Sequence, residues 1–596
     1  MTSSSTRHRT TGSASFGTRQ AAILAGLALF LLGLLAVSHL VSARRQLLLV
    51  GSDLRASRQA LTKRDDTAAK AVLDRADRRL NGASASASAF PLGAIRAVPL
   101  LGSPVRASIT AVRAGREGVA AARTLVAASA SFPTSASSAV DGHDLAAFHA
   151  AAARSQAAVA EADRRLGRAD AALAGPAGAF LPPVSSPARA MRAELAKGRT
   201  ELGAVGRGLN LLADLTGPTS DVRLLFLAQD TLELRPTGGF IGSYGILHFY
   251  RGTVTLENYQ NAQDLPAPVP AATAPLELAR WLPKAWGLTN ANWWPDFPTS
   301  AAAAGELFRR QGGGRVDGVL AMTDLATARL IGALGSIQLP GYPKPVVEEG
   351  FARRVVYEVE LKRPLDEPRK KFLMDLSTAV FDRLFSLPAD KLPAVTDAVR
   401  RSIGAGDIQL WFADPSRQQT LAGTVVAGQL PRTDGDMLMV VDANLLAGKA
   451  NLDVRKSVDY RVERDREGRL IGRVRVEIRN EGAKSPLNLF YRSHLRVYAP
   501  AGAQLVQSEA SQGSTQAVDG PFQVFSQDMV VEPESTAVAT FDYVLPERIA
   551  AHGRYELTWV RQVGTPGDRL RVDVAGRSAQ SDPNTRSLRI QQRLAG

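Results

Sequence analysis

The segment Arg223–Gly245, RLLFLAQDTLELRPTGGFIGSYG, joins an apolar run to a polar stretch that contains glycines. Its first six residues form a short run that is almost wholly apolar, which is typical of a buried strand. Phe240–Tyr250 and Thr253–Tyr259 predict two more strands, joined by a hairpin turn at Arg251-Gly252. Because the polar stretch Gln229–Gly245 follows a buried strand, it should lie at the carboxyl end of that strand, where α/β sheets form ligand crevices.

Strands and helices alternate along residues 216–450, which predicts an α/β domain. The expected helices are Thr299–Arg310, Leu325–Leu334, Phe372–Leu384 and Leu392–Ile403, and the further expected strands are Val316–Met322, Ile408–Phe412 and Met437–Val441.

Residues 451–596 alternate between apolar and polar side chains in steps of two. Val474, Val476 and Ile478, for example, are separated by charged residues, and turn residues separate one such run from the next. This pattern predicts an antiparallel β-sandwich of the immunoglobulin-like class.

Residues 43–215 are rich in Ala, Leu, Arg and Glu and poor in β-branched residues, which predicts a helical stalk or bundle. The window from Leu145 to Leu173 has heptad-like spacing with many alanines, so we expect closely packed antiparallel helices. Gly82–Ala89 and Ser129–Ser138 are predicted to be connections that interrupt the helices. The fold class expected for the whole chain is therefore multidomain α/β.

The N-terminus contains an apolar run from Ala21 to about Val41, long enough for the roughly 20 residues that span a bilayer core. We expect residues 1–19 to be a cytoplasmic tail and residues 20–42 a transmembrane signal anchor. The protein would then be single-pass in the plasma membrane, with its bulk extracytoplasmic. Val41-Ser42-Ala43 leaves open the alternative of a cleaved signal peptide.

The composition excludes several classes of chemistry. The chain of 596 residues has no Cys, which rules out disulfides, a lipoprotein anchor, thiolate zinc sites and cysteine catalysis. Its net charge of +15 comes from scattered Arg residues, in a bias typical of high-GC bacterial genomes. No nucleic-acid-binding motif is present, so we expect lipid headgroups or phosphate-bearing polymers as partners rather than nucleic acid.

The first candidate site is the polar stretch after the first strand. Arg235 and Thr237 are candidate ligand-binding residues, with Arg235 suited to a phosphate or carboxylate. Gly238 and Gly239 permit close approach of the backbone to a ligand. Asp230 is a candidate cation ligand. The alternative is a glycine turn that leads into a strand.

The second candidate site is the loop Asn290–Pro298, NANWWPDFP, where Asn290, Asn292 and Asp296 stand among aromatic residues. Aromatic walls with a few directed polar groups suit a ligand-lining loop. The equally weighted alternative is a capped helix entry, since Pro298 marks a helix start.

Two further segments complete the candidate residues. Arg369 and Lys370 precede an expected helix, where cations oppose the helix dipole and are therefore candidates for holding an anion. Asn444 is a candidate further wall of the crevice. No HExxH zinc motif and no GxSxG nucleophile elbow is present, so the residues leave open whether the protein is an enzyme.

An ordered set of motifs resembles the bacterial domain-of-unknown-function family 4012 over roughly residues 200–590. The motifs are LELRPTGGFIGSYG, NWWPDFPTSA, VDGVLAMT, DEPRKKFL and VVDANLLAGK. The resemblance implies no activity, because the family name carries none.

The order of features is also similar to that of LytR-CpsA-Psr proteins, which transfer glycopolymers from polyprenyl-pyrophosphate carriers to the cell wall. This resemblance implies that Arg235, Arg369 and Lys370 hold phosphate oxygens and that Asp230 with Asp264 holds Mg²⁺. The chain departs from the pattern because no Arg precedes Asp264 and because the expected Arg-Gln pair is replaced by Lys371-Phe372.

Two hypotheses follow. In the first, the protein is a non-catalytic envelope protein that binds a scaffold, glycan or protein partner. In the second, it binds or transfers a polyprenyl-phosphate-linked glycopolymer, with Mg²⁺ as the one candidate cofactor. The missing arginines favour the first.

Overall fold

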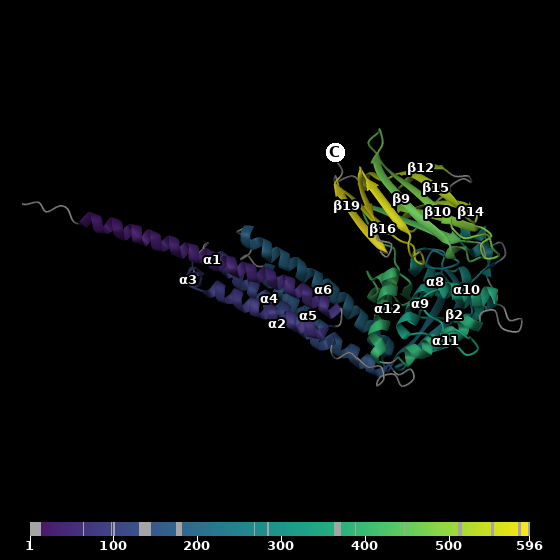
Figure 1. Cartoon of the computed structure of the whole chain (residues 1–596), viewed down its shortest axis with the longest axis horizontal. Coiled ribbons are helices and arrows are strands. Elements are labelled where there is room, and N and C mark those ends of the chain that lie inside the picture. Colours follow the sequence, from purple (N-terminus) through teal and green to yellow (C-terminus); the bar gives the residue numbers. More distant parts are fainter. Residues whose placement is uncertain are drawn as a thin grey trace, which may run out of the picture. The chain divides into compact units, whose positions relative to one another are not determined.

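The computed structural model describes residues 14–62, 65–96, 98, 102–129, 145–174, 182–266, 269–282, 285–362, 371–387, 389–445, 448–509, 515–549, 554–581 and 586–593. The chain divides into two compact units (Figure 1). The first unit comprises residues 1–133 with 150–210, and the second comprises residues 134–149 with 211–596. The fold is therefore a multidomain mixture of helices and several sheets.

The first unit is helical, as predicted. Its helices are α1 (Ala14–Thr62), α2 (Asp66–Ser88), α3 (Leu92–Ile95), α4 (Ser103–Ser129), α5 (Ala146–Ala174) and α6 (Pro182–Thr216). In Figure 1 the N-terminal part of α1 extends beyond the other helices of this unit. A search of the described residues finds no helix that is both long enough and apolar enough to cross a membrane.

The predicted break at Gly82–Ala89 is wrong, because α2 continues to Ser88. Ala83 and Ala87 are buried and extend the apolar stripe of Leu73 and Leu80 along one face. Burial of this stripe outweighs the weak helix propensity of Gly and Ser, since tertiary packing supplies most of a helix's stability. The other predicted connection starts at the last residue of α4, and the rest of it lies outside the described residues.

The second unit contains a five-stranded sheet in the order β3-β2-β1-β6-β7. Its strands are β1 (Asp221–Asp230), β2 (Phe240–Tyr250), β3 (Thr253–Asn261), β6 (Gly318–Thr323) and β7 (Ile408–Phe412). β1 and β6 run parallel, while the other neighbours are antiparallel. The predicted hairpin is confirmed, since Arg251 and Gly252 both have positive φ, as a type I′ turn requires.

Helices cover both faces of this sheet. Successive side chains of β1 point to opposite faces, and because they are apolar on both, each face needs a covering layer. Leu225 and Leu227 pack with α8 (Phe297–Phe308) on one face. Phe226 packs on the other face, where its ring lies 5.4 Å from that of Phe381 in α11. The remaining elements are α7 (Leu276–Ala279), α9 (Asp324–Leu334), α10 (Phe351–Val356), α11 (Lys371–Phe385), α12 (Leu392–Ala405), α13 (Pro415–Thr420), β4 (Val269–Pro270) and β5 (Ala285–Trp286).

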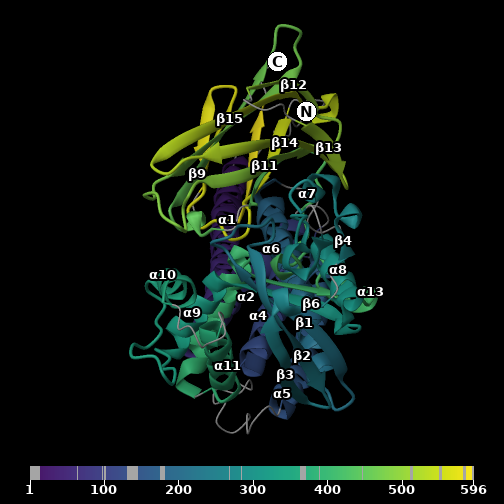
Figure 2. The same cartoon turned by 90° about the vertical axis from the view of Figure 1, so that its right-hand side faces the viewer.

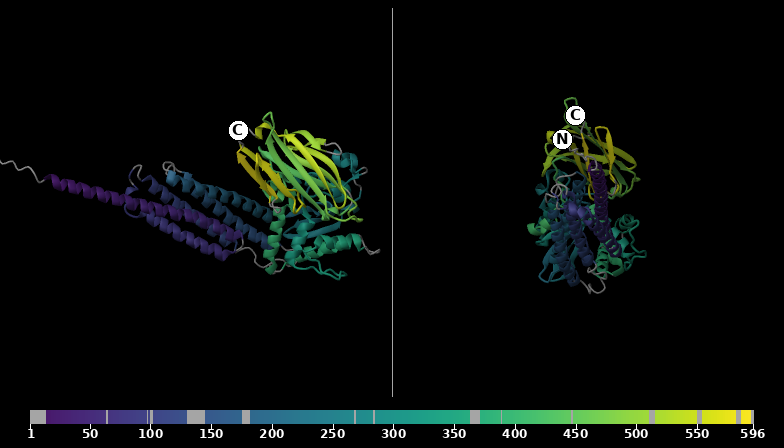
Figure 3. Two further views of the ribbon diagram at one scale, coloured as in Figure 1. Left: turned by 45° about the horizontal axis from the view of Figure 1, so that its top comes forward. Right: turned by 90° about the vertical axis from the view of Figure 1, so that its left-hand side faces the viewer.

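Two six-stranded sheets face each other in the C-terminal part of the second unit, visible in Figures 2 and 3. Their orders are β12-β15-β10-β9-β17-β18 and β13-β14-β11-β8-β16-β19. The strands are β8 (Asp436–Asn444), β9 (Val454–Arg464), β10 (Leu470–Asn480), β11 (Tyr491–Pro500), β12 (Gln504–Glu509), β13 (Thr515–Asp519), β14 (Phe522–Val531), β15 (Ser535–Val544), β16 (Arg554–Val560), β17 (Arg569–Val574), β18 (Arg577–Gln580) and β19 (Ser587–Arg593).

The predicted alternation is confirmed, because Val474, Val476 and Ile478 are fully buried. The prediction of purely antiparallel sheets is wrong. β16 pairs with β8 and β17 pairs with β9 in parallel. Hairpins produce antiparallel neighbours, but β16 and β17 follow β8 and β9 by about a hundred residues of chain and insert beside them in the same direction.

Candidate functional site

A cavity of about 190 Å³ lies at the carboxyl end of β1, within the second unit. Aliphatic and aromatic side chains of α10 and α11, among them Phe351, Val355 and Leu376, form one part of its wall. The other part is polar and contains Asp230, Glu233, Asp324, Glu360 and Lys449. The described lining of the cavity therefore combines an apolar wall with four carboxyl groups and one amine.

Lys449 is the centre of the polar wall. Its Nζ lies 2.6 Å from Asp230 Oδ2 and 2.6 Å from Glu233 Oε1, and 4.0 Å from Glu360 Oε1. Burial acts to lower the pKa of Lys449, but the carboxylates of Asp230 and Glu233 raise it above its ordinary value. The amine is therefore charged, and two carboxylates hold it in place.

Asp324 is the first residue of α9, directly after β6, and its Oδ1 accepts a hydrogen bond of 3.2 Å from the backbone amide of Thr231. Burial, together with the negative charge of Asp230, raises the pKa of Asp324 to about 7. Asp324 therefore changes its protonation state near neutral pH. Since β1 and β6 are parallel, their carboxyl ends bring Asp230 and Asp324 into the same cavity.

The predicted ligand residue Arg235 lies beside this cavity and is buried. Its Nε donates to Asn290 Oδ1 at 3.0 Å, and its Nη1 donates to the carbonyls of Leu234, at 3.1 Å, and Asn444. Burial lowers the pKa of its guanidinium. Arg235 thus joins three parts of the fold through acceptors of the protein itself.

The other residues of the predicted crevice meet around the same turn. Asn292 Nδ2 donates to the carbonyl of Gly239 at 2.8 Å, and Gln229 Nε2 donates to Thr237 Oγ1 at 3.3 Å. Gly238 has a φ of 139°. A Cβ on Gly239 would lie 2.0 Å from the carbonyl oxygen of Asp230, so only glycine fits there. These contacts match the alternative of a glycine turn built into the fold.

Asp296 caps the helix that follows it. Its carboxylate accepts hydrogen bonds from the amide of Thr299 at 3.3 Å and from the amide of Leu430 at 2.9 Å. The interpretation of this loop as a capped helix entry is confirmed. Asn444 lies in β8, and its Nδ2 donates to Asn451 Oδ1 at 3.0 Å.

The predicted Mg²⁺ ligands occupy different surroundings. Asp230 faces Lys449, whereas Asp264 accepts a hydrogen bond of 3.0 Å from Asn261 Nδ2 within a short 3₁₀ helix. Across the described residues, no group of three or more His, Cys, Asp or Glu side chains is arranged so that it could hold a metal ion. Arg369 and Lys370 lie outside the described residues.

Sequence reasoning missed Asp324 and Glu360 as members of the cavity. A signal for Asp324 exists, because VDGVLAMTD is a strand that ends in an acidic residue directly before a helix. A strand parallel to β1 places such a residue at the same sheet edge. Glu360 carries no comparable signal, since a π-helical turn, Tyr357–Leu361, places it there.

Comparison with known proteins finds a family model that matches part of the chain. No curated protein and no solved structure matches the sequence. The family model described as "Protein of unknown function (DUF4012)" matches residues 220–359. This confirms the predicted family over a shorter span than the 200–590 expected from the motifs. The segment from β1 to α10, which supplies much of the cavity wall, is therefore the part of the chain that is similar to the DUF4012 family.

Proposed function

We propose that the protein is a membrane-anchored envelope protein whose bulk lies outside the cytoplasm and whose cavity binds an amphiphilic ligand without catalysis. The run Ala21–Val41 lies within the single continuous helix α1 and would be about 30 Å long. Between Leu31 and Val41, five large apolar side chains are 42–59% exposed. Exposed apolar surface of this kind supports insertion into a bilayer.

The cavity supports a ligand with an apolar body and a cationic group. Among the described lining residues, the polar wall contains the carboxyls of Asp230, Glu233, Asp324 and Glu360 and the amine of Lys449, so acidic groups outnumber amines even where Asp324 is protonated. A buried excess of negative charge favours a cation and repels an anion. The aliphatic side chains of α10 and α11 supply the surface for the apolar body. This pairing of acidic and apolar walls is the observation that carries the proposal.

The contacts among the polar groups of the cavity support binding without catalysis. The amine of Lys449 is engaged by Asp230 and Glu233. Asp230 also accepts the amide of Leu232 at 3.0 Å through its other oxygen. These contacts hold the polar wall in one arrangement before a ligand arrives, which suits recognition.

A second candidate is the binding of polyprenyl phosphate that the LytR-CpsA-Psr resemblance implies. The apolar wall beside Asp230, at the end of the first strand, favours it. A phosphate would face the same carboxylates, so Mg²⁺ would have to lie between them to neutralise the charge. Binding of the phosphate should therefore depend wholly on Mg²⁺.

Calorimetric titration separates the two candidate functions. The full chain in an uncharged detergent is titrated with geranyl amine and with geranyl phosphate, each with and without Mg²⁺. We expect the amine to bind without Mg²⁺, and Glu360→Gln to weaken it several-fold by removing a wall charge. Glu349→Gln, at an exposed position outside the cavity, is the matched control and should change nothing. Phosphate binding that needs Mg²⁺, with no amine binding, would establish the second candidate instead. Absence of binding by both probes would refute both.

A further inference from the structure

The helical unit contains a second apolar space, and its lining residues lie outside the segment that matches the family model. A groove of about 490 Å³ runs between α1, α4, α5 and α6. Leu47 and Leu54 of α1, Ala121 and Leu125 of α4, and Leu195 and Leu202 of α6 are among the residues that line it. The described helices therefore leave an open channel where a bundle would ordinarily close its core.

The charges along this groove are paired with one another. Arg55 lies 3.2 Å from Glu194, and Arg58 lies 3.2 Å from Glu201, so each pair bridges α1 and α6. The remaining lining is made of aliphatic side chains, glycines and a serine. An occupant of the groove is therefore apolar and uncharged along its length.

The dimensions of the groove fit a single hydrocarbon chain. The lining residues of α1, from Leu47 to Arg58, cover about 17 Å of helix. This is close to the roughly 15 Å that the chains of one leaflet span in a 30 Å hydrocarbon core. A volume of about 490 Å³ over that length leaves a cross-section of about 30 Å². A helix about 10 Å wide does not fit such a channel.

The position of the groove points to the membrane as the source of the chain. Arg44, Leu48, Gly51, Arg55 and Arg58 follow one another at spacings of four and three, so they share one face of α1. Leu48 is 47% exposed, and Arg44 is also exposed. Both lie at the end of the groove that is nearer the apolar run Ala21–Val41. A cation there can hold a headgroup phosphate while the chain enters between the helices.

We propose that this groove binds one acyl chain of an anionic phospholipid drawn from the membrane that holds α1. The inference rests on the proposed membrane anchoring, because it takes its ligand from that membrane. It adds a lipid-binding site to the helical unit, which would otherwise serve only as a spacer.

A glycine in the groove can be replaced by a larger residue that fills the groove without disturbing the fold. A Cβ built on Gly51 meets no atom within 4 Å, so a leucine there extends into the open groove. Replacing a helical glycine also improves helix propensity, because glycine loses the most backbone freedom on folding. A Cβ on Gly208 of α6 also meets no atom within 4 Å, and this exposed glycine does not line the groove. Gly208→Leu is therefore the matched control for Gly51→Leu.

The experiment reconstitutes the full chain in vesicles of phosphatidylglycerol that carries a diazirine in its acyl chain, then maps photo-adducts by mass spectrometry. We expect adducts on Leu47–Arg58 and Met191–Val205, several-fold fewer in Gly51→Leu and as many in Gly208→Leu. Arg44→Ser should also reduce them, and phosphatidylcholine should yield fewer than phosphatidylglycerol.

The outcomes separate the two proposals. Adducts on residues 21–41 without adducts in the groove would refute the groove and leave the anchoring intact. The absence of adducts on residues 21–41 would refute the anchoring and the groove together. Groove adducts that persist unchanged in Gly51→Leu would place the label elsewhere and overturn the assignment.

Discussion

The amine of Lys449 lies 2.6 Å from a carboxylate oxygen of Asp230, although the two residues are 219 positions apart. Asp230 ends β1 of the five-stranded sheet, and Lys449 follows β8 of the facing sheets. Their side chains are 27% and 11% exposed. The ion pair therefore connects the two parts of the second unit in the wall of its cavity.

Replacement of Lys449 by Met should destabilise the second unit by about 2–3 kcal/mol. The change leaves Asp230 and Glu233 as unpaired, partly buried carboxylates, and their remaining exposure reduces the penalty below the 3–5 kcal/mol of fully buried pairs. Urea unfolding followed by tryptophan fluorescence measures it. All six Trp residues lie in the second unit, so the signal reports on this unit alone.

A double-mutant cycle with Asp230→Asn tests the cause. If the loss comes from the unpaired carboxylate, the second change should recover about 1 kcal/mol in the Lys449→Met background. Strict additivity of the two single changes would show that the pair contributes no coupling.

The sequence predicted most elements of the fold because their local signals agree with their tertiary surroundings. Phe240–Tyr250 and Ile408–Phe412 are strands with the predicted bounds, since each is rich in aliphatic and aromatic residues and is flanked by turn residues. The predicted break at Gly82–Ala89 was wrong because the burial of Ala83 comes from packing against other helices, which the local composition does not reveal. The prediction of purely antiparallel sheets was wrong for a similar reason. The alternation of side chains along a strand shows which face is buried, but not which strand lies beside it or in which direction that strand runs.

The candidate site was predicted only in part. Of the predicted stretch Gln229–Gly245, the part up to Gly239 lies at the carboxyl end of β1, whereas the residues from Phe240 onward belong to β2. Sequence alone could not show that Arg235 points into the protein, because an arginine that binds a ligand and one that joins backbone carbonyls look alike. The direction of a side chain depends on partners such as Asn444, which is distant in sequence.

Arg235→Ala should destabilise the second unit by about 3 kcal/mol. The carbonyls of Leu234 and Asn444 and the side chain of Asn290 would lose their donor, and a void would remain. Tryptophan fluorescence during urea unfolding measures the loss. Arg353→Ala is the control, because that side chain is 71% exposed and its change should stay within about 0.5 kcal/mol. Equal stability of both variants would contradict the structural role of Arg235.

His494 should make the second unit less stable as pH rises above neutral. Burial and Arg496 act to lower its pKa, but hydrogen bonds to Asp528 at 2.7 Å and Glu277 at 3.3 Å raise it above the ordinary 6.5. Trp293 stacks on the ring. The pKa is higher in the folded state, so the stabilisation is fully present below pH 6.5 and is lost as pH rises through the folded pKa.

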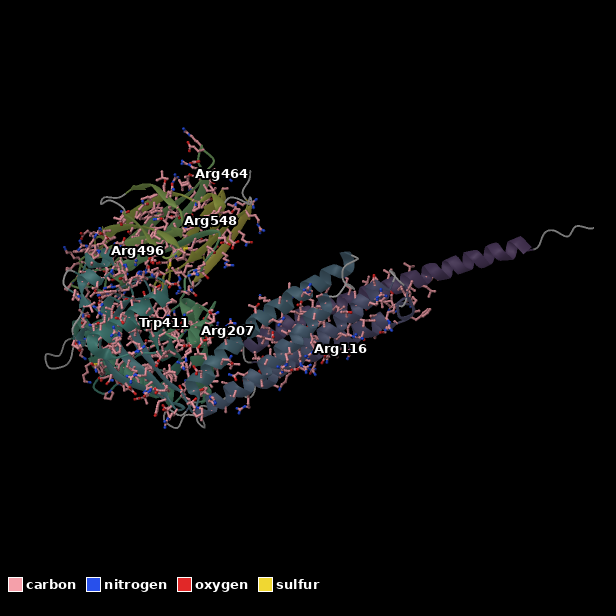
Figure 4. All side chains as sticks on the ribbon, turned by 180° about the vertical axis from the view of Figure 1, so that it is seen from behind. Arg116, Arg207, Trp411, Arg464, Arg496 and Arg548 are labelled. Carbon is pink, nitrogen blue, oxygen red and sulfur yellow. The ribbon has the colours of Figure 1, made fainter. Side chains whose placement is uncertain are left out.

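The difference in unfolding free energy between the wild type and His494→Gln, measured from pH 5.5 to 8.5, isolates this effect. It should be largest at the acidic end and shrink towards pH 8.5. Glu277 stays ionised throughout, because hydrogen bonds from His494 and Ser526 outweigh burial and hold its pKa at about 2. A difference independent of pH would show that the imidazole does not titrate in contact with these acids. Arg496 faces the same cluster and is labelled in Figure 4.

Asp324→Asn should stabilise the second unit at pH 8 and have little effect near pH 4. Burial and Asp230 raise the folded pKa of Asp324 to about 7, so ionisation opposes folding increasingly as pH rises from about 4 to 7. Asn keeps an oxygen that accepts the amide of Thr231, so the helix start is preserved. Urea unfolding of both proteins at several pH values gives the comparison. A gain that is equal at pH 4 and pH 8 would contradict the raised pKa and would attribute the effect to packing.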